Sequence, residues 1–153
     1  MKWGHPPIIK IYEALGAISD ERIKMESNTA KVYSSSGNKF YTVEYDPATT
    51  SVMVNDNGSF YKGYLGYPAL AFLMLQGELT YKPEVAHLLK GIAWKDINQK
   101  FKNDFEKTLT FILEAKTPEE QSALEAEVGR IDAELRAKSY NLLGAKVKPP
   151  EGY

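Results

Sequence analysis

The sequence predicts an α+β fold in which a small antiparallel sheet is followed by helices. Three observations lead to this prediction. Apolar and polar residues alternate in several short segments between positions 22 and 56, which is the spacing of strands. Turn-forming residues separate these segments closely, as in an antiparallel meander of three or four strands. Beyond residue 83, apolar residues recur three and four positions apart, as in helices that bury one face.

A short N-terminal helix over residues 6–16 precedes the meander. Two prolines suit its first turn, where a missing N–H group costs nothing, and Gly16 is expected to end it. In the strand at 39–46, Tyr41, Val43 and Tyr45 are expected to face one side of the sheet, with Phe40 on the other.

The centre of the chain is predicted to be a buried helix over residues 67–76. Its residues Ala69–Leu75 are apolar on every side, so neighbouring elements must enclose it. The preceding segment, 59–66, is expected to form a short edge strand or a loop, because Gly63 and Gly66 disfavour regular structure.

Three further helices are expected after the central one. The first starts at Pro83 and ends near Gly91, and the second covers roughly 96–116. The last covers about 118–143 and begins with a capping Thr, a Pro and two acids. The second and last helices are expected to form a C-terminal helical hairpin.

The last helix carries a narrow apolar seam of coiled-coil spacing, consisting of Leu124, Val128, Ile131 and Leu135. Two interpretations stay open. The seam either packs within the chain or meets a second chain to give a homodimer. We therefore divide the chain into an α+β core domain at 1–116, a C-terminal helix at 117–144 on the core or a partner, and a disordered tail at 145–153.

Composition excludes several classes of protein. The chain has no cysteine, which rules out disulfides, thiolate nucleophiles and cysteine-based zinc sites. A net charge of −1 gives no overall attraction to nucleic acid or to a membrane surface. The longest apolar run has seven residues, whereas a membrane span needs about 20. No secretory signal follows the first residues, so a cytoplasmic location is expected.

Catalytic and cofactor motifs are absent from the sequence. There is no P-loop, dinucleotide fingerprint or HExxH motif, and the two histidines, His5 and His87, have no metal-ligand spacing. Asn55-Asp56-Asn57-Gly58 resembles part of a calcium loop, but the positions of the first and last ligands are Met53 and Tyr64. We therefore expect no cofactor and no metal.

An aromatic loop is the candidate binding site. Aromatic rings beside a cation suit stacking on a flat ligand, whereas the same rings could instead fold over the core as a lid. The residues of this candidate site, with two from the locally basic segment further along, are Phe60, Tyr61, Lys62, Tyr64, Tyr67, Trp94 and Lys95.

These observations favour a small non-catalytic binding or assembly module that uses the aromatic loop and the seam. The first alternative is a nucleic-acid-binding protein that combines tyrosine stacking with lysine contacts. The second is an enzyme whose catalytic groups are far apart in sequence and converge only in the fold. The sequence does not decide whether the protein is an enzyme.

Overall fold

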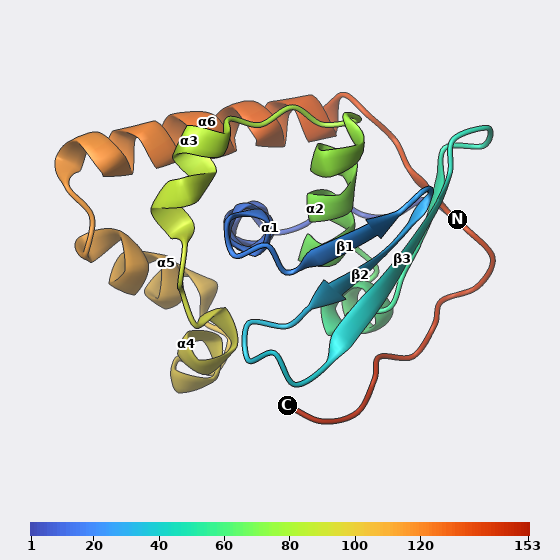
Figure 1. The fold of residues 1–153 in the computed structure, drawn as a ribbon, viewed down its shortest axis with the longest axis horizontal. Coiled ribbons are helices and arrows are strands. Elements are labelled where there is room, and N and C mark those ends of the chain that lie inside the picture. The colour runs from blue at the N-terminus through green and yellow to red at the C-terminus, as the bar shows by residue number, and fades with distance from the viewer.

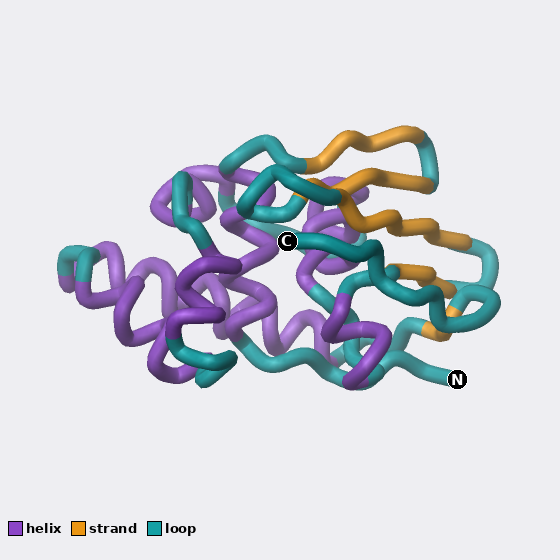
Figure 2. Tube along the Cα trace, turned by 90° about the horizontal axis from the view of Figure 1, so that it is seen from below, coloured by secondary structure: helices purple, strands orange, loops and turns teal.

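A computed structural model describes residues 1–153, and it has the expected α+β architecture (Figure 1). The strands gather at one end of the molecule and most of the helices at the other (Figure 2). The helices are α1 (Ile9–Ser19), α2 (Tyr67–Gln76), α3 (Pro83–Ala86), α4 (Trp94–Lys100), α5 (Phe105–Glu114) and α6 (Pro118–Arg136), with short turns η1 (Gly58–Lys62) and η2 (His87–Leu89).

The sheet has five strands in the order of the sequence: β1 (Ile23–Glu26), β2 (Thr29–Tyr33), β3 (Phe40–Asp46), β4 (Ser51–Val54) and β5 (Asn141–Leu142). The first four form the predicted antiparallel meander. On β3, Tyr41, Val43 and Tyr45 are buried and Phe40 is exposed, which confirms the predicted faces. The sequence did not reveal β5, which pairs in parallel with β4 and has only two residues.

Helix α2 is the centre of the core and matches the predicted range 67–76. All residues from Pro68 to Met74 are buried, because the helix packs against the sheet on one side and α1 on another. Gly77, with a φ of 90°, ends the helix in the left-handed conformation that glycine adopts without strain.

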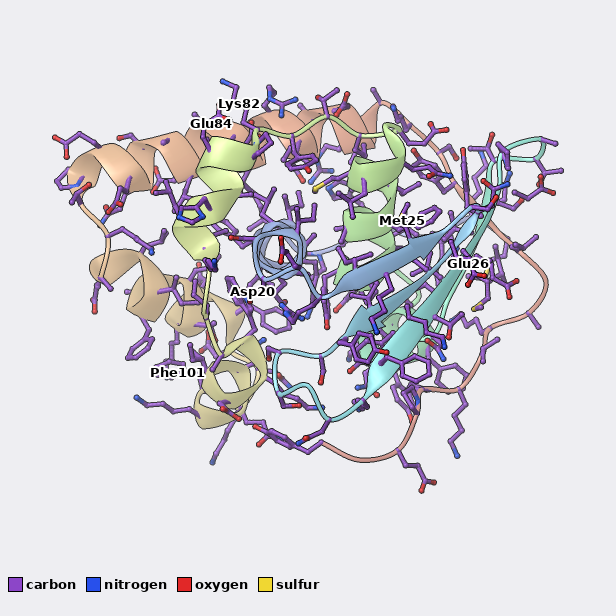
Figure 3. The ribbon with its side chains drawn as sticks, viewed as in Figure 1. Asp20, Met25, Glu26, Lys82, Glu84 and Phe101 are labelled. Atoms are coloured by element: carbon purple, nitrogen blue, oxygen red, sulfur yellow. The ribbon has the colours of Figure 1, made fainter.

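The first helix runs over Ile9–Ser19, not over 6–16 as predicted. Gly16 lies inside it and is buried, so it does not end the helix. An ideal Cβ on Gly16 would lie 2.6 Å from the indole nitrogen of Trp94, which explains why this helical position lacks a side chain. Asp20, which follows α1 (Figure 3), accepts a hydrogen bond from the backbone N–H of Gly91 and so ties α1 to a later loop.

The predicted helix at 96–116 is in fact two helices, α4 and α5. Lys102 and Asn103 adopt φ angles of 53° and 62° between them, so the chain cannot continue as a single helix there. Asp104 then caps α5 by accepting a hydrogen bond from the backbone N–H of Lys107.

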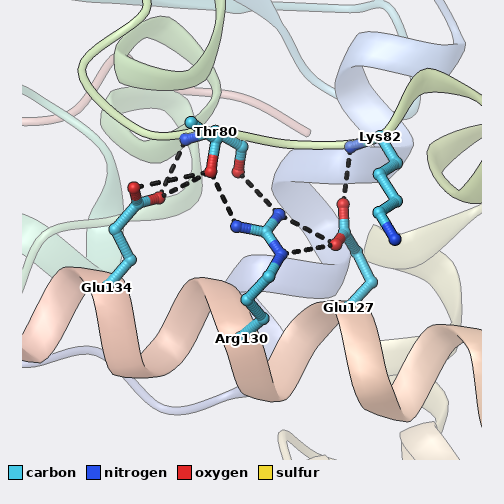
Figure 4. A network of polar contacts seen from close by, with 5 residues as sticks. All are labelled: Thr80, Lys82, Glu127, Arg130 and Glu134. Carbon is cyan, nitrogen blue, oxygen red and sulfur yellow. Dashed lines mark hydrogen bonds and ion pairs between the residues drawn. The ribbon is translucent and has the colours of Figure 1, made fainter.

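Helix α6 begins at the predicted Thr117 cap but ends at Arg136, short of the predicted residue 143. It follows α5 after a short connection and packs chiefly on α1 and α3. A polar network also fastens it to the segment before α3 (Figure 4). There, Arg130 donates to the buried carboxylate of Glu127 and to Thr80, and Glu134 accepts from Thr80. The other Glu127 oxygen accepts from the backbone N–H of Lys82 at 2.6 Å.

Beyond β5 the chain has no helix or strand and runs back along the sheet, so that its end lies beside α4 and the β2–β3 turn (Figure 1). Side-chain hydrogen bonds link this segment to Phe60, Ser36 and Lys95. The domain boundaries and the disorder of 145–153 stay predictions. No helix of the protein combines the length and the apolar character that crossing a bilayer requires.

Candidate functional site

One large cavity lies between α1, the ends of β2 and β3, the segment 56–67 and α4. Its volume is about 820 Å³, within the 300–1,000 Å³ typical of small-molecule sites. Most of the residues that line it are polar or charged, while aromatic rings contribute apolar surface. Its main members are Lys10, Glu13, Arg22, Tyr41, Asp56, Tyr61, Lys62, Tyr64, Tyr67, Trp94, Lys95 and Asn98.

Six of the seven predicted ligand-binding residues lie in this wall: Tyr61, Lys62, Tyr64, Tyr67, Trp94 and Lys95. Phe60 lies outside it and packs edge-on against Tyr61, with ring centroids 4.9 Å apart. The structure thus brings together residues from two distant segments of the chain. That they bind a ligand stays a prediction.

The tyrosines of the loop occupy different depths. Tyr61 is 64% exposed at the mouth, whereas Tyr64 and Tyr67 are partly buried. Tyr67 meets Tyr41 edge-on deeper in the wall, at a centroid distance of 6.2 Å. The loop therefore covers part of the core and at the same time offers rings to a cavity, which combines the two expected alternatives.

A buried polar network fixes the shape of the loop. The hydroxyl of Ser59 donates to Asp56 Oδ1 at 2.5 Å and accepts from the backbone N–H of Gly66 at 2.9 Å. Ser59 N–H also donates to Asp56 Oδ2 at 3.3 Å. The intervening residues form one π-helical turn, η1, a feature that is rare in proteins and frequent at functional sites.

Lys10 and Glu13, one helical turn apart on α1, form an ion pair in the cavity wall, with Nζ and Oε2 2.9 Å apart. Burial by itself lowers the pKa of Lys10, but the charges of Glu13 and Asp56 outweigh burial and the pKa is raised. Lys10 is therefore an ammonium at neutral pH. Burial raises the pKa of Asp56, while hydrogen bonds from Ser59 and the charge of Lys10 offset part of that rise.

Three tyrosines of the wall, Tyr41, Tyr64 and Tyr67, are neutral hydroxyl donors at physiological pH. Burial raises the pKa of Tyr41 to about 12, with the negative charges of Asp56 and Glu13 acting in the same direction. Burial also raises the pKa of Tyr64 and of Tyr67. The cavity thus presents phenol O–H groups, together with the Lys10 ammonium, to whatever enters it.

Three buried wall residues have polar atoms without hydrogen-bond partners: Asn98 at Oδ1, Trp94 at Nε1 and Glu13 at Oε2. The Glu13 oxygen is nevertheless in ion-pair contact with Lys10. The Trp94 ring nitrogen faces Gly16 on α1, and the missing side chain of Gly16 leaves room for the indole there. Arg22 is held at the opposite wall by the backbone carbonyl of Tyr33, at 2.6 Å.

The comparison with protein families matches residues 3–141 to the family described as Uncharacterised conserved protein UCP014422. The chain belongs to this family. The match includes every residue of the cavity wall and all helices of the fold. No curated protein matches the chain. No solved structure matches it either.

Several wall residues of this family member were not predicted from its sequence. Lys10 and Glu13 have the spacing of an ordinary exposed helix pair, and Arg22 stands among charged residues before β1. Tyr41 was placed on the inner sheet face, but nothing local links it to the loop. Asp56 was assigned to the turn at 55–58, for which a calcium site was excluded, and not to a binding site. A signal for its role did exist, since an aspartate followed by Asn57, Gly58 and Ser59 suits a turn that its side chain stabilises.

The seam residues Leu124, Val128, Ile131 and Leu135 are at most 4% exposed and belong to the chain's own core. The fold thus accounts for the seam within one chain, and self-association through it stays a prediction. His87 is exposed and lies outside the cavity wall. No group of three acidic or histidine side chains has a geometry suited to a metal ion.

Proposed function

We propose that the protein binds a small organic anion with a flat polar body in the 820 Å³ cavity. The observation that carries this proposal is the joint presence of four tyrosines and four cationic side chains in one wall that holds only two carboxylates. Rings provide stacking surfaces, hydroxyls provide orientation, and the excess of cations favours a negative ligand.

The distribution of charge suggests how such a ligand would lie. Lys10 is neutralised by Glu13, and Arg22 is close to Asp20, at 3.5 Å. Lys62 and Lys95 have no carboxylate partner, and both belong to the outer part of the wall. The flat body would therefore enter toward Tyr41 and the anionic group would stay at the mouth.

A thermal-shift screen of aromatic carboxylates, sugar phosphates and mononucleotides tests this proposal. A ligand at 100 times its Kd stabilises by about 2.7 kcal/mol, which corresponds to roughly 5–10 °C for a chain of this size. Gln99→Trp places a large ring at an exposed wall position and should abolish the shift. Lys100→Trp, one residue further on α4 and outside the wall, is the matched control. The proposal fails if no compound shifts the melting temperature, or if both variants respond like the natural protein.

An enzyme is the second candidate, favoured by the titratable groups Lys10, Glu13, Asp56 and Tyr64 that gather in one wall. Convergent groups of this kind in a cavity are a general mark of active sites. Glu13, paired with an ammonium and buried, is the residue we would test as a base. Glu13→Gln should then bind the ligand found in the screen and leave it unchanged, while the natural protein converts it.

A further inference from the structure

Two lysines without an aspartate or glutamate partner lie at and beside the cavity wall. Lys95 lies in the first turn of α4 and Lys39 immediately before β3. Neither ammonium has an aspartate or glutamate within ion-pair distance. Burial and the neighbouring ammonium of Lys39 lower the pKa of Lys95 to about 8, and the charge of Asp96 acts in the opposite direction. Both ammonium groups also donate to the same short segment at the end of the chain, residues 150–153.

Main-chain oxygens from the last residues of the chain occupy the space between these ammonium groups. Lys39 Nζ donates to the carbonyls of Pro150 and Gly152, at 3.4 and 3.0 Å. Lys95 Nζ donates to the carbonyl of Tyr153 at 2.9 Å, and the Ser36 hydroxyl donates to the same oxygen at 2.9 Å. These oxygens satisfy the donors, but no aspartate or glutamate side chain is among them.

The position is continuous with the cavity. Lys95 is itself a wall residue, and its backbone N–H donates to the hydroxyl of Ser35, another wall residue, at 3.0 Å. Lys39 Nζ lies 5.4 Å from the centroid of the Tyr41 ring, which also lines the wall. An anionic group bound between the lysines could therefore belong to a molecule whose body lies inside the cavity.

We propose that Lys39, Lys95 and Ser36 form a subsite for a doubly charged group such as a phosphate, and that residues 150–153 occupy it until the ligand binds. A phosphate oxygen accepts charge-assisted hydrogen bonds, which are roughly twice as strong as those to neutral acceptors. Exchange of these oxygens for a phosphate satisfies the same donors and places a doubly charged anion beside both ammonium groups. This proposal adds a phosphate subsite to the proposed function, and it rests on that function for the binding of the organic part of the ligand.

Inorganic phosphate is the probe, because it tests the subsite without an organic body. In a titration followed by ¹H–¹⁵N NMR at low salt, the amide signals of Ser36 and Lys95 should shift. Lys39→Gln and Lys95→Gln should each raise the Kd for phosphate about tenfold or more, the equivalent of about 1.4 kcal/mol. A chain that ends at Pro149 should bind phosphate several times more tightly, since its lysines are not engaged by the tail.

Lys31→Gln is the matched control. Lys31 lies over the Phe40 ring at 5.1 Å, much as Lys39 lies over the Tyr41 ring, but it makes no hydrogen bond to residues 150–153. An equal Kd in all three lysine variants would overturn the subsite, and weaker binding by the shortened chain would overturn its occupation by the tail. The Gln99→Trp variant should still bind phosphate. If phosphate binds but no organic ligand is found, the subsite stands and the proposed function is refuted. If an organic ligand binds the Lys39→Gln variant as tightly as the natural protein, the proposed function stands and the subsite is refuted.

Discussion

Gly66→Ala is the substitution that most directly tests the architecture of the cavity wall. Gly66 has a φ of −73° and a ψ of 168°, a conformation that alanine adopts without strain. An ideal Cβ would nevertheless lie 2.0 Å from Asp56 Oδ2 and 2.3 Å from Oδ1. Asp56 is only 5% exposed, and Ser59 holds its carboxylate by two hydrogen bonds. The carboxylate cannot move aside without losing them.

The expected cost combines steric crowding with lost hydrogen bonds. A methyl group forced into a packed site costs about 1–3 kcal/mol. Loss of a hydrogen bond to a charged group costs about 1.5–3 kcal/mol. If Asp56 moves away from the new methyl group, the crowding falls but hydrogen bonds are lost, so the two costs do not add in full. We therefore expect the free energy of unfolding to fall by about 2–4 kcal/mol, equivalent to roughly 5–15 °C in Tm for a chain of this length.

Urea unfolding followed by far-UV circular dichroism and tryptophan fluorescence measures this change. Gly129→Ala is the control, because Gly129 is exposed on α6 and has no atom within 4 Å of its ideal Cβ. There alanine should stabilise by about 0.5–1 kcal/mol through helix propensity. In an Asp56→Ala background, Gly66→Ala should cost little. A Gly66→Ala protein within about 0.5 kcal/mol of the natural one would refute the reasoning.

Three further predictions concern contacts of α6 and α1. Arg130→Ala removes the charged partner of the buried Glu127 carboxylate and should lower the free energy of unfolding in urea by about 2–4 kcal/mol. Arg136→Ala, which breaks a more exposed ion pair with Asp132, should lower it by at most about 0.5 kcal/mol. Asp132 has a lowered pKa, since hydrogen bonds from His5 and Arg136 outweigh burial. Its contribution to the free energy of unfolding should therefore be present above about pH 4 and be lost as the pH falls through the lowered pKa of Asp132. In Asp132→Asn the free energy of unfolding should depend less on pH in this acidic range. Gly16→Ala should displace the Trp94 indole, visible as a shifted fluorescence maximum and a lower Tm; an unchanged spectrum would contradict that packing.

The meander and the central helix were predictable because their signals are local. Alternation along 39–46 specifies which side chains are buried, and an apolar run such as Ala69–Leu75 has to be enclosed wherever it lies. The break between α4 and α5 was missed because neither Lys102 nor Asn103 demands a left-handed conformation, although asparagine tolerates it. The strand β5 is too short to have a pattern of its own.

The cavity could be predicted only in part, because its wall is assembled from segments that are far apart in the chain. The aromatic loop was identified since rings, glycines and Lys62 are adjacent in sequence. Lys10 and Glu13 were not, because a pair with this spacing usually faces solvent. Only the packing of α1 between α2 and η2 turns their side chains into a wall.

Glycines show how the sequence nevertheless encodes that wall. At three positions an ideal Cβ would come closer than 3.0 Å to another residue, and in each case that residue belongs to the cavity. The pairs are Gly16 with Trp94, Gly58 with Tyr64, and Gly66 with Asp56. Missing side chains thus let an indole, a phenol and a carboxylate approach the backbone more closely than any other residue type permits. Aromatic rings and charges held in fixed positions around one cavity are the arrangement that a binding site needs, and this supports the proposed function.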